Sequence, residues 1–180
     1  WRPWDGVQPA ARMGDDVLAD ATRETLAEAV ESRMPADVPF GVFLSGGVDS
    51  GLVATLAARR GHRFPVFSMR LAGQGYDETG YARQVAARIG ADYHEAVMDH
   101  ADGAEAIELF AARMDQPLGD PSVLPTWALA RLARERVPVV LTGEGGDELF
   151  AGYPTYLGHR LVGLSRHLPG GVADAALALA

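Results

Sequence analysis

Two glycine-rich stretches in this sequence carry residue types that suit a phosphorylated ligand. They read SGGVDS over residues 45–50 and TGEGGDE over residues 142–148. Glycine lets the main chain adopt positive φ angles and come close to a ligand. A carboxylate beside a phosphate would repel it, unless a cation such as Mg2+ lies between the two. A phosphate loop of the Walker type also needs a lysine, and the chain contains none, so the spacing points to another kind of phosphate site.

The first stretch joins an apolar run to a predicted helix. Gly46 and Gly47 allow a close main-chain approach, and the hydroxyl groups of Ser45 and Ser50 add donors. The helix that follows presents free amides and the positive end of its dipole, both of which favour an anion. Asp49 would then face phosphate through a magnesium ion. The alternative is a tight strand-to-helix turn in which Asp49 is an ordinary helix cap.

The second stretch concentrates acidic side chains within five residues. Glu144, Asp147 and Glu148 stand among three glycines. Three carboxylates this close are unfavourable unless a cation or a ligand rich in donors is present. The stretch therefore predicts a second part of a ligand site, and the alternative is a solvated acidic turn.

Alternating strands and helices predict an α/β fold, in which a parallel sheet is flanked by helices. Largely apolar stretches predict strands over 38–44, 64–71 and 137–143, and an alternating pattern predicts one over 92–98. Helical periodicity predicts helices over 16–34, 50–61, 78–90, 103–114, 126–136 and 146–153, followed by a helical tail over 155–180. Ligands of such sheets bind beyond the carboxyl ends of the strands, so both glycine-rich stretches are expected to face one cleft.

Composition narrows the classes of function. The chain has 180 residues, 48% of them apolar, which predicts a globular domain with a sizeable core. There is no cysteine, so the chain itself holds no disulfide, cysteine-based zinc site or cysteine nucleophile. Arginines supply all 16 basic residues against 24 acids, and the net charge of -8 favours small-molecule substrates over a nucleic acid. No apolar stretch is long enough for a membrane span and no signal peptide is evident, so a cytoplasmic location is expected.

These strings resemble a known family. SGGVDS is similar to the pyrophosphate-binding loop of the ATP pyrophosphatases (the PP-loop superfamily), which cleave ATP between the α and β phosphates. The order GVFLSGGVDS, FPVFSMRL, DQPLGDPS and VVLTGEGGDELFAGY closely resembles the synthetase domain of the glutamine-hydrolysing asparagine synthetases, over about residues 15–160. The resemblance implies an adenine nucleotide alpha hydrolase-like fold and an ATP-dependent ligase that uses Mg2+. Such a domain adenylates the β-carboxylate of aspartate, releases pyrophosphate, and lets ammonia attack the adenylate to give asparagine.

The resemblance also assigns roles to residues of this sequence. The pyrophosphate part of ATP would be held by Ser45, Gly46, Gly47, Asp49 and Ser50. The adenosine part would be lined by Phe43, Leu44 and Met69, and the AMP part contacted by Thr142 and Gly143. Magnesium would be bound by Asp49 and Asp147. The catalytic carboxylate, which serves adenylate formation and the attack of ammonia, would be Glu144.

Partners and domain boundaries follow from the same resemblance. It implies a glutaminase domain in the same chain, with residues 1–14 as the linker from it, and leaves a homodimer open. Residues 15–180 would form the ATP-binding synthetase domain, incomplete at its C-terminal end. The family has a lysine further along that assists adenylation, and since this chain contains none, that lysine either lies beyond Ala180 or is absent. Gln116 stands where the family has a glutamate, in DQP instead of DEP.

Two other functions stay open on the sequence alone. The motifs indicate that ATP is bound, but they do not identify the carboxylate that is activated. A related acyl-adenylate enzyme that forms a β-lactam or cyclises a lasso peptide therefore fits them equally. A nucleotide-binding module without turnover fits as well. The tRNA-modifying members of the superfamily are disfavoured by the acidic charge and by the absence of lysine and cysteine.

Overall fold

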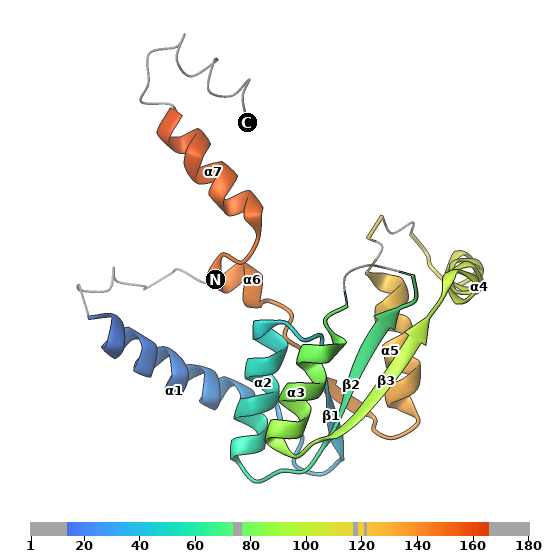
Figure 1. Ribbon diagram of the computed structural model, residues 1–180, viewed down its shortest axis with the longest axis horizontal. Helices are drawn as coiled ribbons and strands as arrows, with labels where there is room; N and C mark the ends of the chain where they lie inside the picture. Colours follow the sequence, from blue (N-terminus) through green and yellow to red (C-terminus); the bar gives the residue numbers. More distant parts are fainter. Residues whose placement is uncertain (1–13, 74–76, 117–118, 121, 166–180) are drawn as a thin grey trace. The chain divides into compact units, whose positions relative to one another are not determined.

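The computed structural model describes residues 14–73, 77–116, 119–120 and 122–165 (Figure 1). The chain divides into two compact units, Trp1–Thr142 and Gly143–Ala180. The predicted linker, apart from its last residue, and the predicted helical tail beyond residue 165 lie outside the described residues. Among the helices that are described, none combines the length and the apolar character that crossing a bilayer requires.

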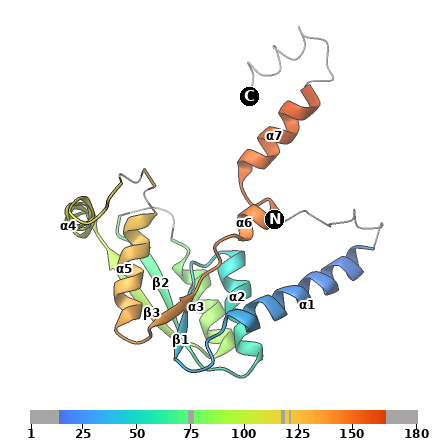
Figure 2. The ribbon, with the colours of Figure 1, turned by 180° about the vertical axis from the view of Figure 1, so that it is seen from behind.

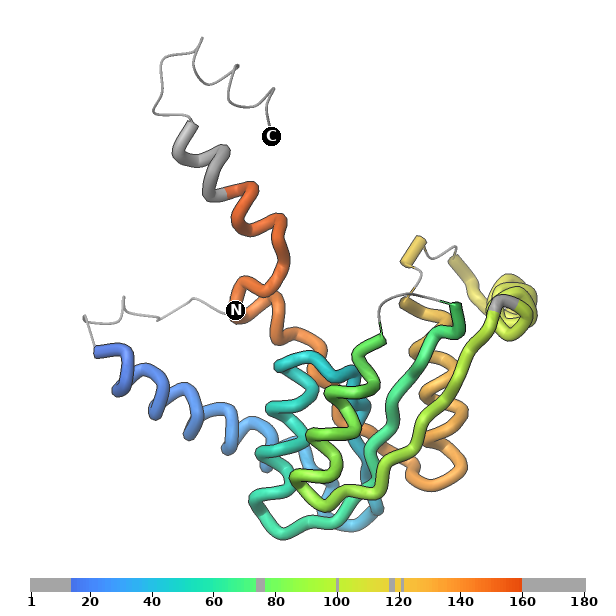
Figure 3. The backbone as a smooth tube through the Cα atoms, in the orientation of Figure 1, coloured from blue at the N-terminus to red at the C-terminus, as the bar shows by residue number. Residues whose placement is uncertain are grey.

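The first unit is built on a four-stranded parallel sheet. Its strands are β1 (Phe40–Phe43), β2 (Pro65–Leu71), β3 (Asp92–Met98) and β4 (Val139–Leu141). Their order is β3-β2-β1-β4, and every neighbouring pair is parallel. Val42 of β1 fixes the register, since it pairs with Val66 of β2 on one side and with Leu141 of β4 on the other. The chain runs outward from β1 through β2 to β3, as the tube in Figure 3 shows, and returns to the opposite side of β1 as β4.

Helices cover both faces of this sheet. On one face α2 (Val48–Arg59) packs against β1 and α3 (Thr79–Ile89) packs against β2 and β3, while α5 (Val123–Arg134) covers β2 and β3 from the other face (Figures 1 and 2). Two further helices lie outside these: α1 (Asp15–Arg33) contacts α2, and α4 (His100–Ala111) contacts α5. The predicted fold class, an α/β fold with a parallel sheet flanked by helices, is confirmed.

Successive strand residues fill two separate cores. Val42 and Val66, both fully buried, lie in the core that α2 and α3 cover. Phe67, the next residue of β2, lies in the core with Ala133 of α5. Gly41 leaves room for the Phe67 ring, because a Cβ atom at residue 41 would lie 2.6 Å from Cε2 of that ring. Burial on both faces is the reason why these strands are continuous apolar runs rather than alternating ones.

Helix α4 begins three residues earlier than predicted. The predicted start was Gly103, whereas the helix begins at His100 with Asp99 as its N-cap. Oδ1 of Asp99 accepts the amides of Ala101 at 2.8 Å and Asp102 at 2.9 Å, and Oδ2 of Asp102 accepts the Asp99 amide at 2.9 Å. This reciprocal pair is a capping box, so the two aspartates were the start signal in the sequence.

The second unit contains α6 (Gly146–Phe150) and α7 (Pro154–Ser165). Helix α6 is shorter than the predicted 146–153. It ends because Ala151 adopts a left-handed conformation with φ 58°, and the amide of Gly152 then donates to the carbonyl of Asp147 at 3.0 Å. Helix α7 confirms the first part of the predicted helical tail.

Candidate active site

The first glycine-rich stretch, residues 45–50, lies at the switch point of the sheet. It follows β1, which has β2 on one side and β4 on the other, and the chain reaches β4 only after passing through β3. In open parallel sheets, ligands bind outside the carboxyl ends of the strands at such a point. The stretch therefore stands where this kind of fold offers a binding crevice.

Two glycines give this loop its shape. Gly46 has a φ angle of 97°, and a Cβ atom there would lie 2.4 Å from the carbonyl oxygen of Glu78, so a residue with a side chain does not fit. Gly47 is the N-cap of α2, and among the described residues no side chain caps that helix. The first-turn amides of α2 are thus available to an anion, as the sequence predicted.

Ser45 and Ser50 connect the two ends of the loop. The Ser45 amide donates to Oγ of Ser50 at 3.1 Å, and the two hydroxyl oxygens are 2.9 Å apart. The Gly47 amide donates to Oγ of Ser45 at 3.2 Å, and the Ser50 hydroxyl donates to the Gly47 carbonyl at 3.3 Å. Ser50 is buried and Ser45 is exposed. Ser50 therefore orders the loop, and Ser45 offers the hydroxyl that a ligand can reach.

Asp49 lies in the first turn of α2 and is half-buried. Because Gly47 is the N-cap, the alternative in which Asp49 caps the helix is wrong. Within the described parts of the chain, no group of three or more His, Cys, Asp or Glu side chains could hold a metal ion. A magnesium site needs fewer protein ligands, since Mg2+ is usually bound by one or two carboxylates together with substrate phosphates. Asp49 beside free helix amides fits a site of that kind.

Three residues predicted to contact the nucleotide lie at or near the carboxyl ends of three adjacent strands. Phe43 is the last residue of β1, Met69 lies in the second half of β2, and Thr142 directly follows β4. These three residues are partly exposed. The side chain of Leu44 is fully buried in the core that α2 and α3 cover, so only its main chain could approach a ligand.

The second glycine-rich stretch lies in the second unit from Gly143 onward. Glu144 is exposed, and Gly145 has a φ angle of 92° and is the N-cap of α6. The carboxylate of Asp147 packs against Gly152, where a Cβ atom would lie 1.9 Å from Oδ1 of Asp147. Gly152 is therefore the residue that leaves room for the Asp147 side chain in its present rotamer.

Glu148, the third acid of this stretch, already has a hydrogen-bond partner. The hydroxyl of Tyr153 donates to Oε1 of Glu148 at 2.9 Å. This hydrogen bond raises the pKa of Tyr153, because the phenol stabilises the neighbouring negative charge only while it keeps its proton. Glu148 thus has a local structural partner within the second unit.

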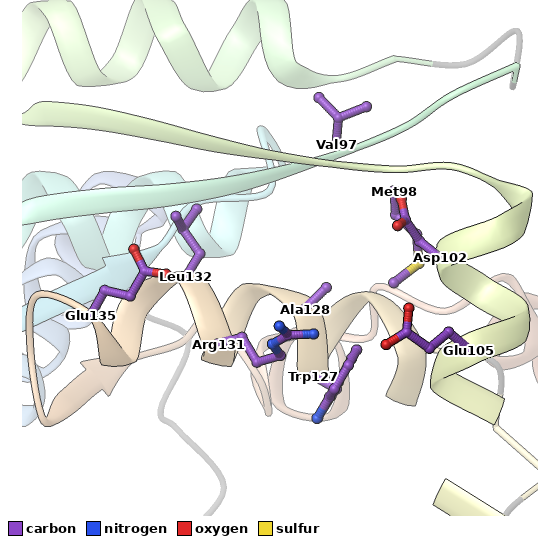
Figure 4. Close-up of a pocket in the computed structure, with 9 residues that line it drawn as sticks. All are labelled: Val97, Met98, Asp102, Glu105, Trp127, Ala128, Arg131, Leu132 and Glu135. Carbon is purple, nitrogen blue, oxygen red and sulfur yellow. The ribbon is translucent and has the colours of Figure 1, made fainter. Parts of the chain in front are cut away.

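A separate pocket of about 240 Å3 lies at the outer edge of the sheet, between β3, α4 and α5 (Figure 4). It is lined by Val97, Met98, Asp102, Glu105, Trp127, Ala128, Arg131, Leu132 and Glu135. The guanidinium of Arg131 lies over the Trp127 ring, 4.7 Å from its centroid. None of the predicted site residues lines this pocket, and Gln116 lies exposed in the loop that joins α4 and α5.

Two contacts of the loop could not be read from the sequence. The hydroxyl of Ser68 donates to the carbonyl of Leu44 at 2.5 Å, and the main chain of Glu78 abuts Gly46. The one available signal was a serine between the apolar residues Phe67 and Met69. A polar residue in a buried strand indicates a hydrogen bond, although it does not say to which group.

Comparisons with known proteins agree with the resemblance noted above. A family model described as asparagine synthase matches residues 21–178. Asparagine synthetase [glutamine-hydrolyzing] 1 of Bacillus subtilis is 34% identical over 142 residues, which cover 79% of this chain and 22% of that protein. Asparagine synthetase [glutamine-hydrolyzing] 2 of Lotus japonicus is 36% identical over 149 residues, which cover 74% and 25%. The chain spans about a quarter of the length of these relatives.

A solved structure with a similar fold is the glutamine-dependent NAD+ synthetase from Acinetobacter baumannii in complex with adenosine diphosphate. The TM-score is 0.49 at 21% identity, covering 82% of this chain and 29% of that one. The family model, by contrast, spans most of the chain and includes both glycine-rich stretches. On that match, the chain belongs to the asparagine synthase family.

Proposed function

We propose that the chain is the ATP-dependent synthetase domain of an asparagine synthetase, which adenylates the β-carboxylate of aspartate and transfers the acyl group to ammonia. The observation that carries the proposal is the loop of residues 45–50. Glycine shapes it, serine hydroxyls order it, and it opens a helix at the switch point of the sheet. Membership in the asparagine synthase family supports an ATP-dependent amide synthetase.

In this proposal the loop holds the β and γ phosphates, which leave together as pyrophosphate. The Gly46 amide and the first-turn amides of α2 would donate to phosphate oxygens. The Ser45 hydroxyl and the Gly47 amide would exchange their hydrogen bonds within the loop for bonds to phosphate, with Ser50 holding the loop in shape. Fixed donors of this kind stabilise the charge that builds on the leaving group, so a lysine is not needed. Asp49 and Asp147 are the proposed ligands of Mg2+, which when bound neutralises charge on the phosphates.

The remaining predicted residues would hold the other half of the nucleotide. Phe43 and Met69 would contact adenosine with their partly exposed side chains. Leu44 would contribute only van der Waals contacts of its main chain, because its amide and carbonyl are bonded to β2. Thr142 and Gly143 are proposed to contact the AMP part. The positions of Phe43, Met69 and Thr142 at or near the carboxyl ends of neighbouring strands support this assignment.

The reaction would take place in two steps. An oxygen of the substrate carboxylate attacks the α phosphorus, the bond from that phosphorus to the oxygen bridging it to the β phosphate breaks, and pyrophosphate leaves. Ammonia then attacks the acyl carbon, its nitrogen gives up a proton, and AMP leaves with the electron pair of the broken bond. Glu144 is the proposed acceptor of that proton, because a nearby carboxylate can act as general base.

The source of ammonia and the assembly belong to the same proposal. We infer a glutaminase domain in the same polypeptide and a homodimer in solution. The full-length sequence tests the first inference. The mass of the purified protein in solution tests the second.

A labelling experiment tests the reaction. The protein at its natural full length is incubated with ATP, Mg2+, ammonium and aspartate that carries oxygen-18 in its β-carboxylate. Equal amounts of AMP and pyrophosphate are expected, with the label in the phosphate of AMP detected by mass spectrometry. Formation of ADP, or AMP without label, would overturn the proposal.

The same assay separates the other functions. A panel of carboxylic acids, including linear precursors of lactams and peptides with free carboxylates, replaces aspartate. Turnover of another acid together with inertness towards aspartate would identify a related acyl-adenylate enzyme. Binding of ATP without release of AMP for any acid would identify a module without turnover.

A further inference from the structure

The residue before the phosphate loop, Leu44, is held by β2 through both of its main-chain polar groups. Its amide donates to the carbonyl of Phe67 at 2.8 Å, and its carbonyl accepts the hydroxyl of Ser68 at 2.5 Å. The last register pair of β1 and β2 is Phe43 with Phe67. Beyond this pair, the side chain of Ser68 supplies the hydrogen bond to the main chain of Leu44. Ser68 is 1% exposed and Leu44 is 0% exposed. A carbonyl buried this deeply needs a partner, and here a side chain supplies it.

The hydrogen bond to Leu44 also constrains the loop itself. The carbonyl of Leu44 and the amide of Ser45 belong to one peptide unit, which is planar. Fixing the direction of the carbonyl therefore fixes the direction of the Ser45 N–H. That N–H donates to Oγ of Ser50 at 3.1 Å, in the network that joins the two ends of the loop.

We propose that Ser68 is a positioning residue for the phosphate loop, because its hydroxyl orients the peptide between Leu44 and Ser45 and so aligns the donors of residues 45–50. The proposal rests on the proposed function, in which this loop holds the pyrophosphate part of ATP. Ser68 itself is too deeply buried to touch the nucleotide.

Loss of the Ser68 hydroxyl leaves the Leu44 carbonyl buried without its donor. The peptide is then free to rotate, and the Ser45 amide no longer points at Ser50. The donors for the β and γ phosphates lose their alignment as a result. The AMP part of the nucleotide does not use these donors, so a positioning role predicts a selective defect.

The test measures three ligands by calorimetry on the protein at its natural full length, with Mg2+ present. For Ser68→Ala, the dissociation constants of ATP and of pyrophosphate are expected to rise about ten-fold, the effect of one well-oriented hydrogen bond. The dissociation constant of AMP is expected to change by less than about two-fold. Ser68→Cys places a weak donor on a somewhat larger atom at the same position, and it is expected to show the same selective loss even if the alanine variant does not fold.

A control variant removes another hydrogen bond from a side-chain hydroxyl to a main-chain carbonyl, at a half-buried position. The Thr55 hydroxyl donates to the Gly51 carbonyl at 2.7 Å within α2, away from Leu44. Thr55→Val is expected to bind all three ligands like the unchanged protein. This comparison separates alignment of the loop from a general loss of stability.

Each outcome has one meaning. If the unchanged protein binds neither ATP nor pyrophosphate, both the proposed function and the role of Ser68 are wrong. If the unchanged protein binds both and the Ser68 variants bind them equally well, only the positioning role is overturned. A loss of AMP affinity as large as the loss of pyrophosphate affinity would also overturn it, since it would indicate general damage.

Discussion

The α-carbon of Gly46 lies against the main-chain carbonyl of Glu78, so closely that a Cβ atom on Gly46 would be 2.4 Å from that oxygen. The same oxygen accepts the amides of Tyr81 at 2.9 Å and Ala82 at 3.2 Å, which form the first turn of α3. It is therefore part of a helix start and cannot move aside without breaking those bonds. The loop of residues 45–50 and the beginning of α3 are in direct contact at this point.

Gly46→Ala is expected to lower stability and to abolish tight binding of ATP. The φ angle of 97° and the short approach to Glu78 act together, and a strained backbone of this kind costs about 2–3 kcal/mol. Urea unfolding and an ATP titration measure the two effects. Gly51→Ala is the control, because a Cβ atom there would lie 3.9 Å from Cγ2 of Val85, an ordinary contact. Unchanged ATP affinity in Gly46→Ala would contradict this reading of the loop.

Glu95 is expected to make stability depend on pH in the acid range. Its carboxylate accepts the hydroxyl of Tyr93 at 2.9 Å and Nε of Arg70 at 3.1 Å, and it also pairs with Arg83. Burial acts to raise the pKa of Glu95, yet these three partners outweigh it and hold the pKa below its ordinary value of 4.5. The folded chain then binds fewer protons than the unfolded chain just below pH 4.5. The stabilisation is therefore present above that pH and is lost as the pH falls through the lowered pKa.

Glu95→Gln tests this pH dependence. At pH 7 the substitution is expected to lower the free energy of unfolding by about 1–2 kcal/mol, since the neutral amide bonds the two arginines less strongly. The difference from the unchanged protein should shrink towards pH 3 in urea unfolding curves. Glu24→Gln, at an exposed position of α1, removes the same charge and should change stability by less than about 0.5 kcal/mol. A difference that stays constant from pH 7 to pH 3 would show that the Glu95 charge is not the cause.

Gly152→Ala is expected to disturb the proposed magnesium ligand Asp147. A Cβ atom at residue 152 would lie 1.9 Å from Oδ1 of Asp147, so the carboxylate must leave its rotamer. We expect the Mg2+ concentration for half-maximal pyrophosphate release to rise about ten-fold, as for other supports of metal ligands. Gly158→Ala in α7 meets nothing within 4 Å and should leave the Mg2+ requirement unchanged. If both variants behave alike, Asp147 does not bind the ion.

Glu144→Gln is expected to slow amide formation by about 100-fold or more, the usual contribution of a general base. The affinity for ATP should stay within about two-fold, because an uncharged side chain of the same size replaces Glu144. Glu148→Gln is the matched control from the same stretch, since the Tyr153 hydroxyl already bonds Glu148. Rates are followed by AMP release with ammonium in excess. Full activity of Glu144→Gln would show that Glu144 is not the general base.

Local sequence patterns predicted the presence of each strand better than its first and last residues. β3 occupies the predicted residues 92–98, and β2 differs from its prediction by one residue. β4 was predicted over 137–143 but covers only Val139–Leu141, because its three residues pair with Phe40–Val42 of β1. The length of a strand depends on its neighbour, and a single apolar run does not carry that information. The strand order β3-β2-β1-β4 could not be predicted from local patterns for the same reason, since it depends on which strands pair.

The same distinction between local and long-range information applies to the residues of the candidate site. The close main-chain approach at Gly46 was predictable, because glycine permits the conformation that the loop adopts there. The hydrogen bonds that Ser45 and Ser50 form within the loop were not predicted, since both hydroxyls were expected to donate to phosphate. Ser68 was not predictable either, since it is 24 residues from Leu44 along the chain and only the pairing of two strands brings the two together. The residues that hold a loop in place from outside are thus harder to predict than those that form it.

The burial of Ser50 has a consequence for how fast the loop takes up its ligand. Its hydroxyl joins Ser45 and Gly47 through hydrogen bonds within the loop itself, so the loop is ordered by its own side chains. Little conformational entropy is left to lose on binding, which favours affinity through preorganisation. Association should then be a single second-order step whose observed rate rises linearly with nucleotide concentration, without the plateau that a closing loop would impose.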